Sequence, residues 1–131
     1  MEMKINFSEG KKVNVSYDNF LIRTDQKIQN GGENTNPDPF SLFIASIGAC
    51  TGFYVLSFCQ ERKIETKNII LKLVTKKNID NKLIDEINID IIADKTFPDK
   101  YKKSIIKVAN LCTVKKHLEK PPRINISLLK N

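Results

Sequence analysis

Polar and apolar residues alternate along the first part of the chain with the two-residue period of half-buried β-strands. The predicted strands are Lys4–Phe7, Val13–Tyr17 and Phe20–Ile22. A turn over Ser8–Lys11 joins the first two strands, and Asp18-Asn19 turns the chain into the third. From 25 to 38 the chain becomes rich in Asn and Gly, which predicts a loop.

The next segment has no charged residue over twenty positions, from Phe40 to Cys59. Pro39 suits the first turn of a helix, and Asp38 before it can cap the amide groups of that turn. Beyond the run, Arg62 and Lys63 bring cations to the negative end of a helix. We therefore predict one long, apolar helix.

Alternation returns in the second half of the chain. The predicted strands are 69–75 and 84–91, with a last strand over Ile124–Leu128. Between them, apolar residues at helical spacing predict an amphipathic helix from Phe97 to Cys112. This order of elements indicates an α+β fold in which antiparallel sheets wrap the helices. A length of 131 residues favours a single domain over 1–131.

The uncharged run is also long enough to cross a bilayer. It contains small and polar residues, however, and segments predicted as parts of one sheet flank it on both sides. A membrane would separate those segments, so we expect no membrane partner and a soluble, buried helix. Gly48 and Gly52, four positions apart, indicate that a neighbouring element or a symmetry-related copy crosses this helix closely.

The net charge of +7 raises the question of nucleic-acid binding. The lysines are spread along the sequence with acidic residues among them, and the aromatic–basic interleaving that stacks bases is absent. We therefore expect no nucleic-acid partner. The first residues, Met1-Glu2-Met3-Lys4, lack the apolar segment of a signal peptide, which favours the cytoplasm and free thiols.

Two of the three cysteines lie in the predicted apolar helix. Cys50 has small neighbours, Gly48, Ala49 and Gly52, which leave room for a substrate to approach its sulfur. Cys59 lies about 180° around the same helix, so it cannot pair with Cys50 and is expected to pack in the core. A lone cysteine is also a common small core residue, and the pattern alone leaves Cys50 open between packing and chemistry.

Cys112 is predicted to end the second helix, and basic residues follow it. Lys115, Lys116 or His117 beside the thiol would lower its pKa, or else they are surface residues favoured at a helix end. No CxxC, HExxH or Cys/His cluster is present, so no metal is expected. Two thiols far apart in sequence fit a thiol peroxidase, in which a sulfenic acid formed on one condenses with the other.

The segment Asn36-Pro37-Asp38-Pro39, followed by an apolar run and Gly48-Ala49-Cys50, resembles the first-cysteine motif of the OsmC/Ohr hydroperoxide-reductase family. The segment from Leu111 to Leu118, with Pro121-Pro122 behind it, is similar to that family's second-cysteine segment. The order of the predicted elements also fits. The resemblance covers nearly the whole chain and is to the OsmC-like branch.

This resemblance implies an intertwined homodimer, with the two long helices at its centre and the active sites at the subunit interface. By the same analogy Cys50 is the peroxidatic thiol and Cys112 the resolving thiol, and the two form a disulfide during turnover. The implied substrates are organic hydroperoxides, and the implied reductant is a dithiol such as a lipoyl protein. The family implies no bound cofactor and no metal.

The family's best-studied branch orients the first cysteine with an arginine and a glutamate. In this sequence Ser41 stands at the glutamate's position. Asp38 with Lys11, Lys12 or Arg23 is the candidate substitute, although a lysine lacks the planar fork of arginine.

Two alternatives to a peroxidase are open. The first is a non-enzymatic or weakly active dimer that binds a small apolar molecule in an interface pocket lined by Phe53, Tyr54 and Phe58. The second is a hydrolase or transferase that uses Cys50, for which the sequence offers no base.

Overall fold

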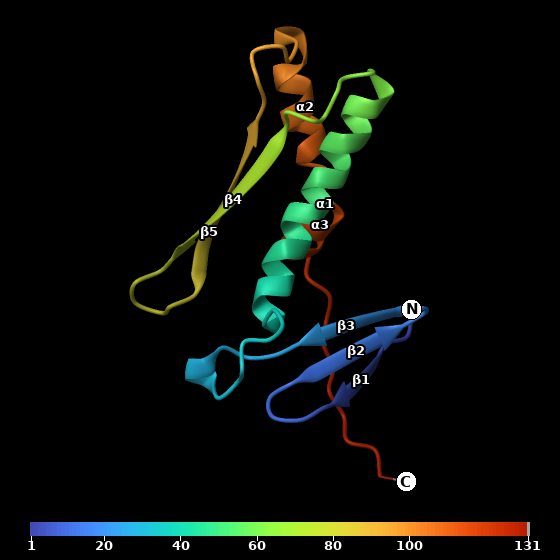
Figure 1. Cartoon of the computed structure of the whole chain (residues 1–131), viewed down its shortest axis with the longest axis vertical. Helices are drawn as coiled ribbons and strands as arrows, with labels where there is room; N and C mark the ends of the chain where they lie inside the picture. The colour runs from blue at the N-terminus through green and yellow to red at the C-terminus, as the bar shows by residue number, and fades with distance from the viewer. Residues whose placement is uncertain (131) are drawn as a thin grey trace. The chain divides into compact units, whose positions relative to one another are not determined.

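Within residues 1–130, which the computed structural model describes, two antiparallel sheets and three α-helices form an α+β fold (Figure 1). The predicted fold class is confirmed. The chain divides into two compact units, Met1–Ala45 and the part from Ser46 onward. A single domain over 1–131 stays a prediction.

The first unit contains a meander of β1 (Lys4–Phe7), β2 (Val13–Tyr17) and β3 (Phe20–Thr24). Antiparallel pairing joins β1 to β2 and β2 to β3. Gly10 and Asp18 take the left-handed backbone conformation in the two turns, with φ angles of 66° and 46°. The three predicted strands are confirmed, and the third extends further, to Thr24. A loop with a short 3-10 helix, η1 (Ile28–Asn30), follows.

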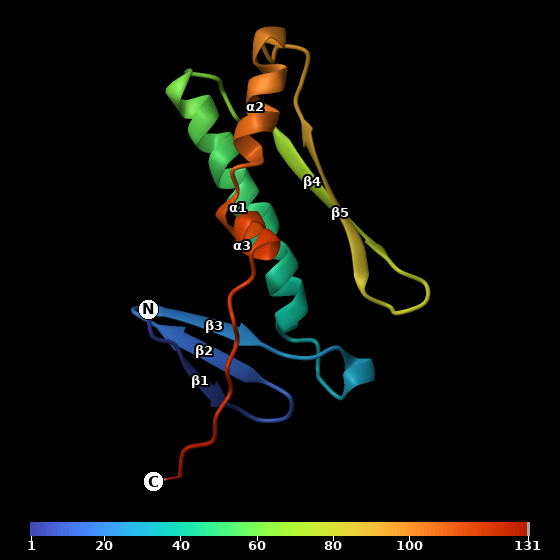
Figure 2. The same cartoon turned by 180° about the vertical axis from the view of Figure 1, so that it is seen from behind.

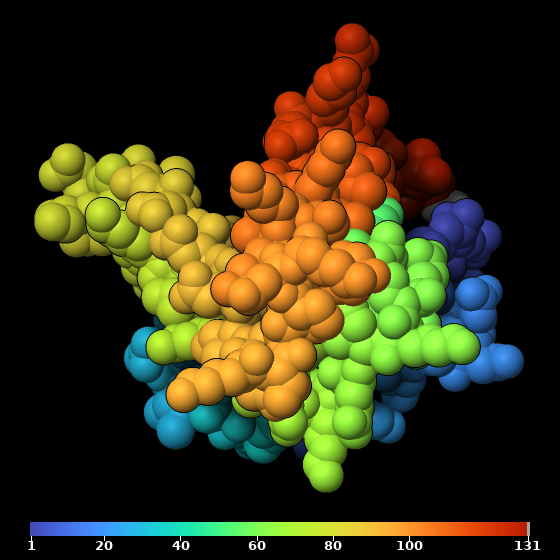
Figure 3. All heavy atoms as spheres, turned by 90° about the horizontal axis from the view of Figure 1, so that it is seen from above, coloured from blue at the N-terminus to red at the C-terminus, as the bar shows by residue number. Residues whose placement is uncertain are grey.

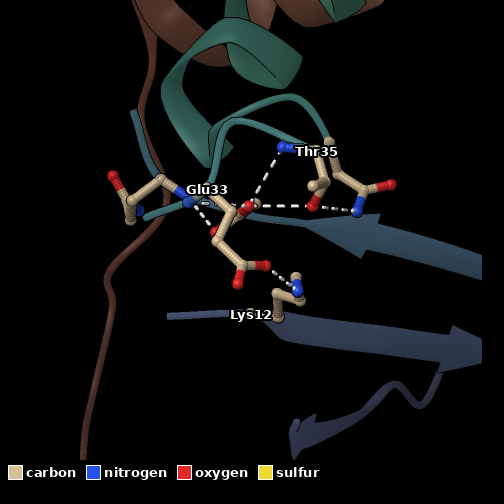
Figure 4. A network of polar contacts seen from close by, with 6 residues as sticks. Lys12, Glu33 and Thr35 are labelled. Carbon is tan, nitrogen blue, oxygen red and sulfur yellow. Dashed lines mark hydrogen bonds and ion pairs between the residues drawn. The ribbon is translucent and has the colours of Figure 1, made fainter. Parts of the chain in front are cut away.

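A buried carboxylate, Asp25, organises this loop. It accepts hydrogen bonds from the amide groups of Gln26, Glu33 and Thr35 and from the Thr35 hydroxyl, at 2.7 to 3.2 Å. These donors, the Thr35 amide foremost, lower the pKa of Asp25 from 3.8 to about 2. Figure 4 shows this network together with the ion pair between Lys12 and Glu33.

The long helix α1 (Pro39–Glu61) forms as predicted, with Pro39 in its first turn. Asp38 is the predicted N-cap, because the amide group of Ser41 donates to its Oδ1 atom at 3.1 Å. The helix ends at Glu61, shortly before Lys63 takes a left-handed conformation with a φ of 54°. The residues of α1 that are buried share one face, at helical spacing: Ile47, Thr51, Val55, Phe58 and Cys59.

Helix α1 is long and apolar enough to cross a membrane by length and composition, with a mean hydropathy of 1.9 over its most apolar stretch. Only 28% of that stretch is buried within the single chain. The prediction of a buried helix therefore holds for one face of α1 in the described chain. The other face carries exposed apolar side chains, among them Phe53 and Leu56.

In the second unit β4 (Ile70–Lys77) and β5 (Ile84–Ile92) form an antiparallel hairpin. A Cβ atom at Gly48 would lie 3.5 Å from Leu73, and one at Gly52 would lie 4.0 Å from Leu71. The close neighbour predicted for the two glycines is therefore β4 of the same chain. Toward its turn the hairpin diverges from α1 (Figure 2), and the turn projects to one side in Figure 3.

The amphipathic helix predicted from Phe97 to Cys112 is confirmed over most of its length, where a 3-10 helix, η2 (Asp99–Tyr101), runs into α2 (Lys102–Ala109). It ends before Cys112, and a separate helix that was not predicted, α3 (Thr113–Glu119), follows. The Asn110 side chain donates to the Ile106 carbonyl at 2.9 Å, and the Leu111 amide donates to the Val108 carbonyl at 2.9 Å. These local bonds tighten and close α2, so Cys112 opens a new helix.

The last strand predicted over Ile124–Leu128 is not formed within the described chain, where residues 121–130 have neither helix nor strand. A strand requires a neighbour with which to exchange backbone hydrogen bonds, and an alternating pattern alone does not supply one. Ile124 and Ile126 are accordingly 83% and 94% exposed.

The core of the second unit lies where α1, α2 and the base of the hairpin meet. Its buried cluster consists of Val55, Phe58, Cys59, Ile105 and Ala109. Partly buried residues of β4 and β5, Leu71 and Ile91 among them, pack against it. This packing fixes the rotation of α1, and with it the direction in which each side chain of the helix points.

The pKa of Asp25 predicts how its contribution to stability depends on pH. Because its pKa in the folded protein lies below the ordinary 3.8, that contribution is present above about pH 4 and is lost as the pH falls toward 2. We expect Asp25→Asn to lower the urea midpoint of unfolding at neutral pH. The difference in midpoint between the variant and the wild type should become smaller below about pH 4. Asp90→Asn, at an exposed position of β5, is the control. A difference in urea midpoint that does not change with pH would contradict the pH-dependent contribution assigned to Asp25.

Candidate active site

Cys50 lies on α1 at the edge of the buried face, and its side chain is partly exposed. Thr51 beside it belongs to that face, and Gly48 and Gly52 are the positions that face the leucines of β4. A thiol on a packed helix has a fixed direction. Its partial exposure leaves it accessible to a small molecule.

Cys112 is the N-cap residue of α3 and is 1% exposed. Its Sγ atom accepts a hydrogen bond from the amide group of Lys115 at 3.4 Å. As a thiol it also donates a weak hydrogen bond to the carbonyl oxygen of Ile47 on α1, at 4.0 Å. Cys112 thus takes the N-cap role that Ser, Thr, Asp and Asn usually fill.

The structure brings Cys50 and Cys112 together. Both are free thiols, and the Cys50 side chain is among the hydrogen-bonding neighbours that lower the pKa of Cys112. A disulfide requires two neighbouring sulfurs on side chains that point toward each other. The two cysteines that such a bond would join are thus neighbours within one chain.

The surroundings of Cys112 favour its thiolate. Burial opposes ionisation, but hydrogen bonds outweigh it and lower the pKa of Cys112. The donors are the amide groups of Lys115 and Val114, the Cys50 thiol and the Thr51 hydroxyl. Each donor stabilises the anion more than the neutral thiol, because the negative charge makes sulfur the better acceptor.

A lower pKa for Cys112 was predicted from the basic residues that follow it, but the physical source differs. The Lys115 ammonium group hydrogen-bonds the Asn110 side chain at 2.6 Å, and His117 Nδ1 lies 2.8 Å from the Thr113 carbonyl oxygen. The backbone amide of Lys115, rather than its side chain, contacts the sulfur. This geometry exists because Cys112 begins a helix instead of ending one.

Thr51 is a site residue that the sequence analysis missed. Its side chain is buried, and its hydroxyl donates to the Ile47 carbonyl at 2.8 Å. The same carbonyl receives the weak hydrogen bond of Cys112, so Thr51 Oγ1 and Cys112 Sγ lie around one oxygen atom. The position of Thr51 beside Cys50 was visible in the sequence, but its approach to Cys112 is a long-range contact without a sequence signal.

Cys59 packs in the core, as predicted. It is fully buried, and burial raises the pKa of its thiol, while the charge of Arg62 partly offsets this effect. Cys59 is therefore the least accessible of the three thiols, and burial disfavours its ionisation.

The three aromatic residues of the alternative pocket have different surroundings. Phe53 is 61% exposed, and the Tyr54 hydroxyl lies 3.1 Å from Thr113 Oγ1 on α3. Phe58, in contrast, is 2% exposed and packs in the core against Tyr101, with ring centroids 5.7 Å apart. The prediction that Phe58 lines a pocket is therefore wrong, because its ring is already covered by the chain's own core.

A cavity of about 400 Å³ opens in the second unit. Arg62, Asp94 and Tyr101 are among the residues that line it, and neither Cys50 nor Cys112 does. Across residues 1–130, no three His, Cys, Asp or Glu side chains gather as a metal site.

The predicted cations belong to the first unit. Lys12 forms an ion pair with Glu33, and the hydrogen bond from this pair raises the pKa of Lys12. Lys11 lies in the turn after β1, and Arg23 lies on β3, both exposed. Glu33 is the second residue that the sequence analysis missed, because its approach to Lys12 depends on how the loop folds around Asp25.

The predicted carboxylate, Asp38, uses both of its oxygens in hydrogen bonds to the first turn of α1. It accepts from the amide group of Ser41 at 3.1 Å and from the Ser41 hydroxyl at 2.6 Å, and these bonds lower its pKa. Among the described residues no ion pair joins Asp38 to Lys11, Lys12 or Arg23. Their role toward Cys50 stays a prediction.

The chemistry that this arrangement supports is that of a dithiol. Cys50 is the accessible sulfur, and Cys112 is a buried sulfur whose ionised form is stabilised beside it. Such a pair suits thiolate attack on an electrophile followed by disulfide formation.

Residues 32–127 match the family described as OsmC-like protein. No curated protein sequence matched this chain.

Solved structures share the fold over most of their length. A protein from Psychrobacter arcticus 273-4, provisionally named an osmotic stress induced and detoxification response protein, is 20% identical, with a TM-score of 0.73 over 87% of this chain and 85% of that one. An organic hydroperoxide resistance protein OsmC from Legionella pneumophila is 13% identical, with a TM-score of 0.56 over 89% and 87% of the two chains. A Vibrio cholerae protein, provisionally named an organic hydroperoxide resistance protein, is 17% identical, with a TM-score of 0.56 over 92% and 86%.

The burial of the three thiols predicts an order of reactivity. We expect iodoacetamide to modify Cys50 first in the native, reduced protein, and to reach Cys59 only after unfolding in urea, because Cys59 is covered and its pKa is raised. Peptide mapping by mass spectrometry gives the site of each modification. Equal rates at Cys50 and Cys59 in the native protein would contradict the described packing.

Proposed function

Because this chain belongs to the OsmC-like protein family, we propose that it is a thiol-dependent peroxidase that reduces organic hydroperoxides through Cys50 and Cys112. Family membership by itself supports a redox role in general terms. The observation that carries the finer proposal is that a partly exposed thiol, Cys50, neighbours a buried one, Cys112, whose Sγ atom accepts the Lys115 amide and whose pKa is lowered. Two similar structures bear the name organic hydroperoxide resistance protein, which agrees with this substrate class.

The reaction takes two steps at sulfur. The Cys50 thiolate attacks one oxygen of the hydroperoxide, the O–O bond breaks, and the alkoxide takes a proton and leaves as an alcohol, so that Cys50 becomes a sulfenic acid. The Cys112 thiolate then attacks the sulfenic sulfur and expels hydroxide, which is protonated to water, as the disulfide forms. The two cysteines lose two electrons, which an external dithiol such as a lipoyl protein returns by thiol–disulfide exchange.

We include a homodimer in this proposal. Phe53 and Leu56 on α1 are 61% and 41% exposed, and a second copy packed on this face would remove their apolar surface from water. The OsmC-like fold indicates a protein that is not embedded in a membrane, so we assign α1 to the protein core. A cytoplasmic location belongs to the proposal.

A specific observation also favours the non-enzymatic alternative. The exposed Phe53 ring stands edge-on to Tyr54, with centroids 5.5 Å apart, and the pair presents an apolar surface close to Cys50 in the sequence of α1. A small apolar ligand could bind there without any chemistry at the thiols. Catalytic consumption of a hydroperoxide distinguishes the two, because a protein that only binds a ligand would not consume it.

Consumption of cumene hydroperoxide with dihydrolipoamide as reductant tests the proposed function. We expect multiple turnovers by the wild type and only the uncatalysed rate for Cys50→Ser, because the attacking sulfur is lost. Cys112→Ser should consume about one equivalent of peroxide per chain, because Cys50 is oxidised but not resolved to the disulfide. Cys59→Ala, in the core, is the matched control and should turn over like the wild type. Wild-type turnover retained by Cys50→Ser would refute the peroxidase.

A further inference from the structure

We propose that the cavity at the end of α1, in the second unit, is a binding site for a small organic carboxylate with an apolar body. The cavity has a volume of about 400 Å³, which lies within the range of small-molecule sites. Neither Cys50 nor Cys112 lines it, so the site is separate from the thiols and the inference does not depend on the proposed function.

Two connections of the second unit form the walls of the cavity. The first runs from the end of α1 to β4, and the second runs from β5 to α2. Both lie at the same end of the unit in Figures 1 and 2, and Figure 3 looks onto this end. Ile64 and Ile69 of the first connection, and Phe97 and Tyr101 of the second, also pack against the buried core. The core therefore fixes the shape of the cavity.

The first observation is that Arg62, which lines the cavity, is held in one orientation. Its guanidinium carbon lies 3.8 Å from the centroid of the Phe58 ring, the distance of a stacked cation. Its Nη1 atom donates to the Phe58 carbonyl oxygen at 3.2 Å, and the side chain is 33% exposed. An arginine fixed in this way loses little conformational freedom when it binds an anion.

One edge of this guanidinium is unused. The hydrogen bonds of the Arg62 side chain within residues 1–130 go to Phe58 and Glu61, and both come from Nη1. Glu61 is an exposed residue of α1 and does not line the cavity. The Nε and Nη2 atoms form the edge with which an arginine binds a carboxylate side-on, through two parallel hydrogen bonds. Arg62 therefore has a bidentate edge available for a ligand.

The second observation is positive charge that has no partner in the cavity. The cations that line it are Arg62, Lys63 and Lys100, and the carboxylates are Glu65 and Asp94. Among the residues that the structure describes, no ion pair joins one of these cations to either carboxylate. An anion that enters the cavity therefore meets cations that the cavity's own carboxylates have not neutralised.

Asp94 uses its oxygens to hold the walls together. Its Oδ1 atom accepts from the amide group of Thr96 at 2.9 Å and from the Thr96 hydroxyl, and its Oδ2 atom accepts from the Asn68 side chain at 2.7 Å. These bonds lower the pKa of Asp94 and link the two connections. Because both oxygens are engaged in the wall, Asp94 leaves the edge of Arg62 to a ligand.

The rest of the lining determines which anion fits. Apolar side chains complete the cavity and favour a ligand with an apolar body over a bare inorganic anion: Ile64, Ile69, Phe97 and Pro98. The helix end at this site is the C-terminus of α1, whose partial negative charge disfavours a dianion, whereas phosphate is favoured at helix N-termini. A singly charged carboxylate on an apolar body meets both conditions.

Titration of the ¹⁵N-labelled protein with 4-phenylbutyrate, followed by NMR, tests the site. We expect the signals of the Arg62 Nε–H group and of residues 62–69 and 94–101 to shift with one dissociation constant. The neutral amide, 4-phenylbutyramide, should bind about tenfold more weakly because it lacks the charge that the guanidinium pairs with. Acetate, which has no apolar body, and inorganic phosphate should also bind more weakly. Equal affinity for the acid and the amide, tighter binding of phosphate, or shifts confined to other residues would overturn the inference.

A matched pair of variants separates the site from general surface charge. Lys100 lines the cavity, with its ammonium group 4.9 Å from the centroid of Tyr101, and Lys95 lies in the same connection without lining it. We expect Lys100→Gln to weaken the binding of 4-phenylbutyrate by about threefold, the size typical of one exposed charge pair, and Lys95→Gln to leave it unchanged. An equal loss of affinity in both variants would contradict a defined site.

Arg62→Lys tests the planar fork, because it keeps the charge and removes the bidentate edge. We expect about tenfold weaker binding of 4-phenylbutyrate in this variant. Since Arg62 also stacks on Phe58, the thermal unfolding midpoint is measured alongside, and Lys100→Gln, at an exposed position, tests the site independently of that stacking. A folded Arg62→Lys that binds as tightly as the wild type would refute the site. Cys50→Ser should bind 4-phenylbutyrate like the wild type, so this titration and the peroxide assay give independent results.

Discussion

The packing of one face of α1 against the hairpin and α2 is the constraint on which the site depends. Val55, Phe58 and Cys59 are held in the core of the second unit, which fixes the rotation of the helix about its axis. With that rotation fixed, Ile47 and Thr51 lie on the buried face. The Ile47 carbonyl oxygen accepts from both the Thr51 hydroxyl and Cys112, and Thr51 and Cys50 are among the neighbours that lower the pKa of Cys112.

The break between α2 and α3 is the second part of this construction. If one helix ran through Cys112, the sulfur would stand near carbonyl groups, which repel a thiolate. Because α2 closes at Ala109 and Cys112 opens α3, the sulfur receives amide hydrogens instead. A change of one helix boundary therefore reverses the electrostatic environment of the thiol. Backbone amide groups thus stabilise the Cys112 thiolate, whereas the sequence predicted that side-chain cations would do so.

Local signals in the sequence predicted much of the fold. Proline at position 39 with Asp38 as N-cap gave the start of α1, and alternation gave β1, β2, β4 and β5 to within a few residues. The break after Ala109 was missed because it depends on the hydrogen bonds of one asparagine, Asn110. The final strand was overpredicted, since pairing is a long-range property that alternation does not encode.

For the candidate site, too, local signals predicted some residues, and residues that depend on long-range contacts were missed. Cys50 and Cys112 were identified by their motifs, and Cys59 by its angle on the helix. Thr51 and Glu33 were missed, because each matters through a contact with a residue distant in sequence, Cys112 for the first and Lys12 for the second. The predicted association of Asp38 with a cation did not anticipate that Ser41 would satisfy both of its oxygens.

The account's central claim is that Cys50 and Cys112 are one redox unit. Its most direct test is the disulfide connectivity of the protein after one equivalent of cumene hydroperoxide, determined by mass spectrometry of peptides prepared without reduction. The account predicts a single cross-linked species that joins the peptides of Cys50 and Cys112, with Cys59 recovered as a free thiol. A chain in which Cys50 is oxidised but never linked to Cys112, or in which the cross-link involves Cys59, would contradict it.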